Sequence, residues 1–202
     1  MSIVIKKIHK KFKENTILNI DNFEFSNNLY KLIGKNGSGK STLLEIIAGI
    51  DKHFEGKIIS KNKDILYLNS SPIGISTMTI EDNLKLLWKT FKLFPNSEEL
   101  KYINSLFDNN LNIPYATSST GTKAKLGLSL LVFNRWDTIL IDETLATIDE
   151  QSLFLISNLI LRLKKEQKTT IIYVAHNIQN TKLDKNANII ILEKGKLNVK
   201  NK

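Results

Sequence analysis

A glycine-rich stretch with a lysine and a serine at fixed spacing is the part of the sequence best suited to chemistry. It matches the pattern G-x-x-x-x-G-K-[ST] completely. Glycines let the backbone bend sharply and bring its N–H groups close to a polyphosphate. In this pattern the lysine reaches the β- and γ-phosphates, and the hydroxyl that follows it ligates Mg²⁺. The residues expected to bind ATP are Gly34, Lys35, Asn36, Gly37, Ser38, Gly39, Lys40, Ser41 and Thr42.

Two carboxylates follow an apolar stretch that is typical of a buried strand. Asp142 and Glu143 come directly after residues 138–141. The carboxyl ends of parallel strands meet at one edge of a sheet, where α/β proteins bind ligands. We expect Asp142 to hold Mg²⁺ together with Ser41, and Glu143 to take a proton from an attacking water. In the alternative interpretation, Glu143 caps the next helix.

Two further side chains are candidates for the same site. His176 follows the apolar stretch 170–175 and would open onto the same edge, where it could bond a γ-phosphate oxygen and position water. His176 is therefore a candidate catalytic residue beside Lys40 and Glu143, and the alternative is a structural histidine. Phe12 lies in a polar segment. Its ring either stacks on an adenine or folds onto neighbouring strands.

The elements that must position these residues follow from the pattern around them. The apolar stretch Leu29–Ile33 predicts a strand before the glycine-rich loop, and residues 42–48 predict a helix after it. This strand–loop–helix context is the one that a phosphate-binding loop requires. Three short stretches with alternating polarity predict an antiparallel flap ahead of the loop: Ile3–Ile5, Thr16–Ile20 and Phe23–Phe25.

A helical segment interrupts the predicted strands in the middle of the chain. Thr79–Asp82 resembles a capping box that opens a helix through about Phe91. Ser97 opens a second helix with acidic residues in its first turn, and residues 123–132 have a helical pattern. An amphipathic helix is also expected over 152–163. The pattern therefore predicts an α/β fold with an α-rich insert.

Composition limits the class of protein. The chain has 202 residues, which suits a single domain, and it has no cysteines, which excludes disulfides and thiolate metal sites. Its first residues lack the apolar region of a signal peptide, and no apolar run approaches the length of a membrane span. We therefore expect a soluble, cytosolic protein. The net charge of +9 favours anionic partners, or reflects solvated lysines.

The order of these motifs resembles that of the nucleotide-binding ATPase subunits of ABC transporters, over nearly the whole chain. The Walker A motif at 34–42, the Walker B motif at 138–143 and His176 follow that family's order. Between them, residues 118–123 resemble the family signature, usually written LSGGQ. Ser119 matches the signature serine, and Gly121 matches its second glycine.

The resemblance implies a P-loop NTPase fold of the ABC ATPase type. Such a fold has a mostly parallel core sheet, an N-terminal antiparallel β subdomain and an inserted α-helical subdomain. We expect one domain over residues 1–202. Its core and antiparallel part would comprise about 1–78 and 131–202, and its helical subdomain about 79–130.

The resemblance also implies two ATP sites at the interface of a head-to-tail dimer. Walker A, Asp142, Glu143 and His176 would come from one subunit, and the signature of the partner would complete the site. Asp149 matches the aspartate of the D-loop, which lies at that interface. The residues that this resemblance adds to the nucleotide site are Phe12, Ser119, Gly121 and Asp149.

The sequence departs from the family pattern at several positions. A glutamine of the family falls on Ser70, beside Asn69, so Ser70 is the expected metal contact there despite its shorter side chain. The signature carries a serine and two threonines where Leu, Gly and Gln are usual. Asp-Glu-Pro-Thr is replaced by residues 142–145, whose third residue is Thr144. These changes indicate a divergent branch, and they bear on the coupling step and the turnover rate more than on ATP binding.

The resemblance implies an ATPase that powers a transporter through ATP-dependent dimerisation. The chain would work as a homodimer, or as a heterodimer with a similar ATPase, on permease subunits at the cytoplasmic face of the membrane. Export of peptides and immunity to antimicrobial peptides are the expected roles, with ATP and Mg²⁺ as cofactors and no nucleic acid.

Three alternatives belong to other classes. The charge supports a cytosolic ABC-type ATPase that acts on nucleic acid or ribosomes, but such proteins usually carry two ATPase domains or a long coiled-coil arm, and we expect neither in this sequence. A small-molecule kinase would need an arginine-rich lid, and Arg135 and Arg162 are the only arginines. The third alternative is a module that binds ATP but no longer hydrolyses it. The residues that argue against it are Lys40, Asp142, Glu143 and His176, all of which are intact.

Overall fold

The computed structural model describes residues 2–61, 64–167, 169–175 and 181–200. Its central sheet contains β5 (Ile65–Leu68), β6 (Thr138–Asp142), β7 (Thr170–Val174), β3 (Leu29–Ile33), β8 (Asn188–Glu193) and β9 (Lys196–Val199), in that spatial order. The strands from β5 to β8 are parallel, and β9 closes the edge by antiparallel pairing with β8. The carboxyl ends of β3, β5, β6 and β7 therefore face the same edge.

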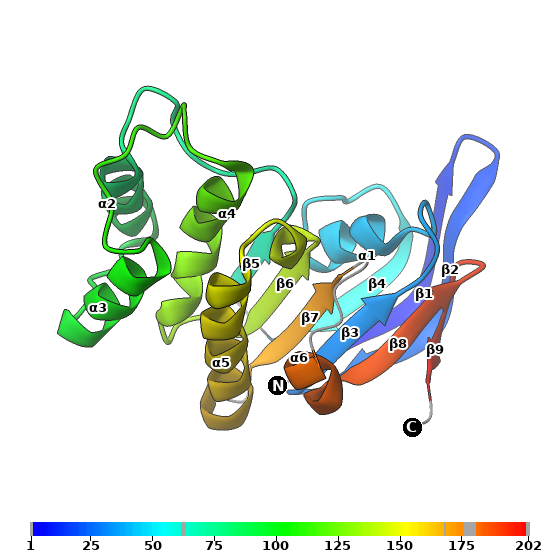
Figure 1. Cartoon of the computed structure of the whole chain (residues 1–202). Helices are drawn as coiled ribbons and strands as arrows, with labels where there is room; N and C mark the ends of the chain where they lie inside the picture. Colours follow the sequence, from blue (N-terminus) through cyan, green and yellow to red (C-terminus); the bar gives the residue numbers. More distant parts are fainter. Residues whose placement is uncertain (1, 62–63, 168, 176–180, 201–202) are drawn as a thin grey trace.

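A second, antiparallel sheet lies beside the first. It contains β1 (Ile3–Phe12), β2 (Asn15–Phe25) and β4 (Glu55–Ser60), in the order β2-β1-β4. Figure 1 shows β1 and β2 at one end of the molecule, and α2 (Ile80–Phe91), α3 (Ser97–Leu106) and α4 (Thr120–Ser129) at the other. The central sheet lies between them, with α5 (Glu150–Gln167) and α6 (Thr181–Asn186) near α4 and β7.

Two apolar cores arise because strand side chains alternate between the faces of the central sheet. In β6, Ile139 and Ile141 pack with α5 and the helices α2–α4, whereas Leu140 faces the other core. That second core joins α1 (Lys40–Ile47) to both sheets. The helix α1, which begins at the glycine-rich loop, is thus fixed from two sides.

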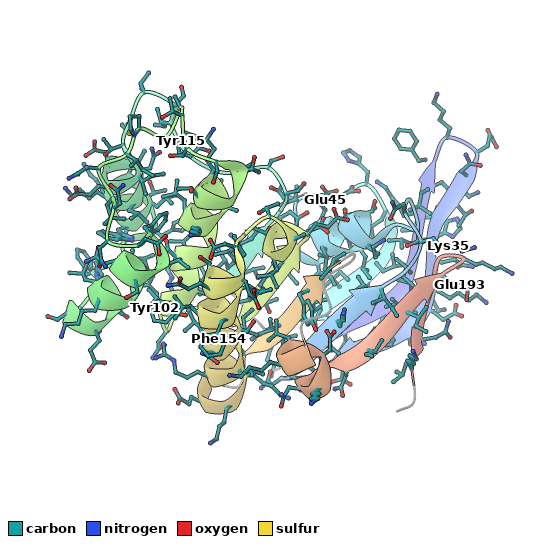
Figure 2. The ribbon with its side chains drawn as sticks, viewed as in Figure 1. Lys35, Glu45, Tyr102, Tyr115, Phe154 and Glu193 are labelled. Atoms are coloured by element: carbon teal, nitrogen blue, oxygen red, sulfur yellow. The ribbon has the colours of Figure 1, made fainter. Side chains whose placement is uncertain are left out.

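Local sequence signals set the helix ends. The Thr79 side chain accepts a hydrogen bond from the Asp82 backbone N–H at the start of α2, and Asn96 and Glu99 form a capping box at α3. Tyr102, which lies between α3 and α5 (Figure 2), donates to the Leu155 carbonyl oxygen at 2.5 Å. No helix in the described ranges has both the length and the apolar character of a membrane span.

The mixed α/β fold with a mostly parallel sheet is confirmed, but the predicted flap of three strands ahead of the loop is wrong. The stretches 16–20 and 23–25 belong to one strand, β2, and the third strand, β4, comes after α1. In β2, the alternation of buried and exposed side chains shifts between Ile20 and Phe23. The sequence pattern suggests a turn at this point. A matching shift occurs opposite, where Lys7 of β1 has φ 50°, so pairing continues through it.

The boundaries at 78/79 and 130/131 stay a prediction. The helices α2–α4 lie within the expected insert. A short 3-10 helix, Leu130–Val132, extends α4 to the end of the stretch for which a helix was expected.

Candidate active site

The glycine-rich loop joins β3 to α1 with a sharply bent backbone. Gly37 and Gly39 have φ of 76° and 96°, a region that favours glycine. A side chain at Gly39 would also meet the Ile17 side chain at 2.7 Å. No described side chain caps the start of α1, so the first backbone N–H groups of this helix are available to an anion.

Lys40 begins α1 and turns its ammonium back into the loop. The side chain is buried, and its Nζ donates to the carbonyl oxygens of Gly34 and Lys35, both at 3.0 Å. Burial lowers the pKa of Lys40, while the carboxylates of Glu143 and Asp142 act in the opposite direction. The ammonium is thus held beside two acidic side chains by bonds that phosphate oxygens could replace.

Asp142 ends β6 with one carboxylate oxygen unpaired. The residue is only 5% exposed, and among the described residues its Oδ1 has no hydrogen-bond partner. Its Oδ2 lies 3.5 Å from the Tyr67 hydroxyl, whose pKa is raised by burial and by the Asp142 charge. Mg²⁺ prefers carboxylate oxygens as ligands, and a buried carboxylate oxygen with no hydrogen-bond partner among the described residues is suited to bind it. Asp142 therefore fits the expected metal.

Glu143 lies in a strained turn directly after Asp142. Its φ is 59°, which is uncommon for a residue with a side chain, and its backbone N–H donates to the Val174 carbonyl oxygen at 3.1 Å. Glu143 lines a cavity of about 490 Å³, a size typical of small-molecule sites. The cavity is also lined by Lys10, Phe12, Ile17, Asn36, Gly37, Gly39, Lys40, Ser41, Thr42, Glu45 and Asp51.

The lining of this cavity also includes an exposed aromatic ring and an ion pair. Phe12 is 69% exposed, so its ring does not fold onto the strands. Lys10 Nζ lies 2.7 Å from an Asp51 carboxylate oxygen and donates to the His53 carbonyl oxygen. The hydrogen bond from Lys10 lowers the pKa of Asp51. Lys10 precedes Phe12 by two positions in the same strand, and residues with this spacing share a face. The spacing could therefore have predicted that Lys10 lies in the same site as Phe12.

The expected signature residues lie outside the cavity. Ser119 caps α4 and accepts a hydrogen bond from the Thr122 backbone N–H at 3.0 Å. A side chain at Gly121 would meet the Thr147 carbonyl oxygen at 2.6 Å, so α4 packs closely on the segment after β6. Neither Ser119 nor Gly121 lines the cavity that holds Lys40 and Glu143.

Asp149 binds a lysine of its own chain. Its carboxylate lies 2.7 Å from Nζ of Lys125, a buried residue of α4, and accepts from the Ser152 backbone N–H at 2.8 Å. Burial alone would raise the pKa of Asp149, but the bonds from Lys125 and Ser152 hold that pKa well below its usual range. This pair connects α4 to the start of α5.

Other expected residues occupy neighbouring sites. Ser70 and Asn69 are exposed and line a cavity of about 40 Å³ beside α4, not the one that contains Ser41. Gly34, Lys35 and Ser38 line a cavity of about 280 Å³ that also includes Glu193, and Lys35 and Glu193 lie on the same side of the molecule in Figure 2. His176 lies outside the described residues.

Comparisons with known proteins identify a family and relatives of this chain. Residues 18–146, more than half of the chain, match the family model described as ABC transporter. A Bacillus subtilis protein described as an uncharacterized ABC transporter ATP-binding protein is 31% identical over 186 residues, which cover 86% of this chain and 85% of the relative. The lipoprotein-releasing system ATP-binding protein of Rickettsia typhi is 29% identical and covers 98% of this chain and 97% of its own length.

Solved structures share the fold. The dimeric post-hydrolysis state of an ATP-binding cassette, bound to ADP and Pi, has a TM-score of 0.78 at 22% identity and covers 98% of this chain and 97% of that chain. An ATP-binding subunit of an ABC transporter has a TM-score of 0.79 at 20% identity and covers 98% of this chain and 90% of that one. At these identities the likeness bears on the architecture alone.

Proposed function

This chain belongs to the ABC transporter family as an ATP-binding ATPase subunit, and we propose that two such subunits close head to tail over two Mg²⁺–ATP and so drive a separate membrane permease. The observation that carries the proposal is that the cavity lacks the expected signature residues. Phe12, Lys40 and Glu143 line one cavity, whereas Ser119 and Gly121 lie outside it in the same chain. A second copy of the chain would place its own Ser119 and Gly121 against this cavity.

Each residue of the proposed site would have a role that follows from its chemistry. The loop N–H groups and Lys40 would bind the phosphates, and the exposed ring of Phe12 would stack on the base. Ser41 and Asp142 would hold Mg²⁺, which neutralises charge on the phosphate oxygens. Glu143 would accept the proton of the attacking water, and His176 would orient that water beside the γ-phosphate.

Ser70 and Asp149 would take part only in the closed dimer. Ser70 would approach the metal only if its loop moved toward Ser41, because the two residues line different cavities. Asp149 would act at the dimer interface while it stays bound to Lys125. Both assignments depend on the closed dimer.

The partner would be an integral-membrane permease at the cytoplasmic face, and the cargo a peptide. The departures at Ser70 and Thr144 support a divergent branch, and one relative is named for lipoprotein release. Action on nucleic acid or ribosomes is less favoured, because one relative given above is named an ABC transporter ATP-binding protein and the other a lipoprotein-releasing system ATP-binding protein. Identification of the membrane protein that purifies with the chain would test the partner and narrow the cargo.

Replacing Glu143 by Gln tests the central proposal. The substitution keeps the size of the side chain and removes the base, so turnover should fall by about 10²- to 10⁴-fold, while an ATP-bound dimer accumulates. Phosphate release and light scattering after gel filtration measure the two effects. Glu24→Gln, on the exposed face of β2, is the control and should behave as the wild type.

Two results would contradict the proposal. Turnover near the wild-type rate in Glu143→Gln would exclude Glu143 as the base. A strictly monomeric Glu143→Gln protein in saturating ATP, both in solution and with its permease, would exclude closure over nucleotide.

A further inference from the structure

A loop between the sheet and the helical part of the molecule is fastened at its far end. We call residues 69–75 the bridging loop; it follows β5 and precedes α2. The buried Asn83 side chain accepts from the Ile75 N–H at 2.6 Å and donates to the Ile75 carbonyl oxygen at 3.1 Å. Tyr115, labelled in the helical part in Figure 2, packs so closely on Gly74 that an added Cβ would lie 2.4 Å from its ring.

The near end of the bridging loop is fastened by a hydroxyl that belongs to the active-site turn. Thr144 is 4% exposed, and its Oγ1 lies 3.0 Å from the Asn69 carbonyl oxygen. The carbonyl oxygens of Leu68 and Asp142 are slightly farther away, at 3.2 and 3.3 Å. A hydroxyl has one proton to donate, so Asn69 is the best placed of these acceptors.

The same turn also contacts the helix that carries the signature. Thr147 Oγ1 donates to the Thr144 carbonyl oxygen at 2.9 Å. The Thr147 carbonyl oxygen in turn lies where a side chain at Gly121 would sit. The turn after Glu143 is therefore packed between the bridging loop and α4.

We propose that Thr144 is a positioning residue that ties the bridging loop to the catalytic carboxylate. Its hydroxyl is one residue away from Glu143, which already has a strained backbone. Through the bond to Asn69, a displacement of the loop changes where Glu143 lies. The loop's own side chains at Asn69 and Ser70 are short and exposed. In this chain the link thus runs from the turn to the loop backbone.

Amide hydrogen exchange without nucleotide tests the link itself. Thr144→Val keeps the shape and removes the donor, so the amides of Ser71 and Ile75 should exchange about 2- to 10-fold faster, the effect of one lost hydrogen bond. Thr144→Ser should restore slow exchange. Thr169→Val is the matched control, because the buried Thr169 hydroxyl donates to the Trp136 carbonyl oxygen, away from this loop. Unchanged exchange in Thr144→Val, or an equal increase over the whole chain, would overturn the proposal.

Steady-state hydrolysis tests the positioning role, and this arm rests on the proposed function. Thr144→Val should lower kcat by about 2- to 10-fold with KM for ATP unchanged, and Thr144→Ser should recover the loss. A wild-type kcat in Thr144→Val, despite a faster-exchanging loop, would overturn the positioning role. Failure of the wild type itself to hydrolyse ATP would instead contradict the proposed function, and the exchange data would still decide the link.

Discussion

At the scale of single residues, two adjacent carboxylates have different environments. Asp142 is still part of β6 and is buried, and its Oδ1 has no hydrogen-bond partner within the described part of the chain. Glu143 leaves the strand through a left-handed backbone conformation and lines the large cavity. Neighbouring strand residues would point to opposite faces, so the turn at Glu143 is what directs the second carboxylate toward Lys40.

Phe12 provides a prediction at this scale. Stacking of a base on an aromatic ring contributes about 1–3 kcal/mol, so Phe12→Ala should weaken ATP binding by roughly 5- to 150-fold. Phe12→Trp should retain binding, because it keeps an aromatic face. Titration with a fluorescent ATP analogue that is labelled on the ribose measures the affinities. Equal affinity of Phe12→Ala and the wild type would show that the ring does not contact the base.

At the scale of elements, α4 is attached to the segment after β6 by an ion pair. Lys125 is buried and Asp149 is 54% exposed, so the lysine depends on the carboxylate more than the reverse. Close packing at Gly121 adds a second contact between the same elements. The signature helix and the start of α5 should therefore move together.

Asp149→Asn should lower the melting temperature by about 2–6 °C, because it leaves a buried ammonium without its counter-charge. The amide keeps an acceptor for the Ser152 N–H, so helix capping is preserved. In the double variant with Lys125→Met the loss should be largely recovered, since no buried charge remains. Calorimetry of the four proteins measures the coupling, and strict additivity would contradict it.

The same pair predicts a pH dependence. The pKa of Asp149 is lower in the folded chain than the unfolded value of about 3.9, so its contribution to stability is complete above that pH. The contribution is lost as the pH falls further. The difference in melting temperature between the wild type and Asp149→Asn should be constant from pH 7 to about 5 and shrink below about pH 4. A difference that grows on acidification would refute this assignment.

The features that could be predicted from the sequence are those set by residues that are adjacent in the chain. The phosphate loop and the strand that ends at Asp142 are local patterns, and both form as expected. Other features depend on contacts between distant residues. Lys10 meets Asp51 only because β1 lies beside the loop after α1, and the Thr144 bond joins residues 75 positions apart. The paired shift in β1 and β2 is also non-local, because neither strand alone shows that its neighbour compensates.

At the scale of the whole molecule, the residues of the proposed site lie in two separate parts of one chain. The large cavity lies beside α1 and the antiparallel sheet, whereas Ser119 and Gly121 lie at the start of α4, next to the helical end seen in Figure 1. In the proposed dimer, the start of α4 in one subunit would meet the cavity of its partner. A two-fold axis makes such an interface isologous, so the reverse contact would form as well and the dimer would hold two equivalent sites.

Mixed dimers test this division. A Ser119→Arg subunit and a Lys40→Ala subunit should each be inactive alone. A purified mixed dimer contains one site with both halves intact, so it should recover a part of the wild-type turnover. Phosphate release from tagged heterodimers gives the measurement. Complete inactivity of verified heterodimers would count against shared sites.

The bonds from Lys40 to the carbonyl oxygens of Gly34 and Lys35 have a consequence for repeated cycles. After products leave, the Lys40 ammonium can bond to these carbonyl oxygens again, and the empty glycine-rich loop keeps its bent backbone. Binding of a new nucleotide then replaces these carbonyl oxygens by phosphate oxygens around Lys40, and the loop backbone does not have to rearrange. A crystal soaked in and out of nucleotide should therefore show the Lys40 side chain moving within a nearly stationary backbone.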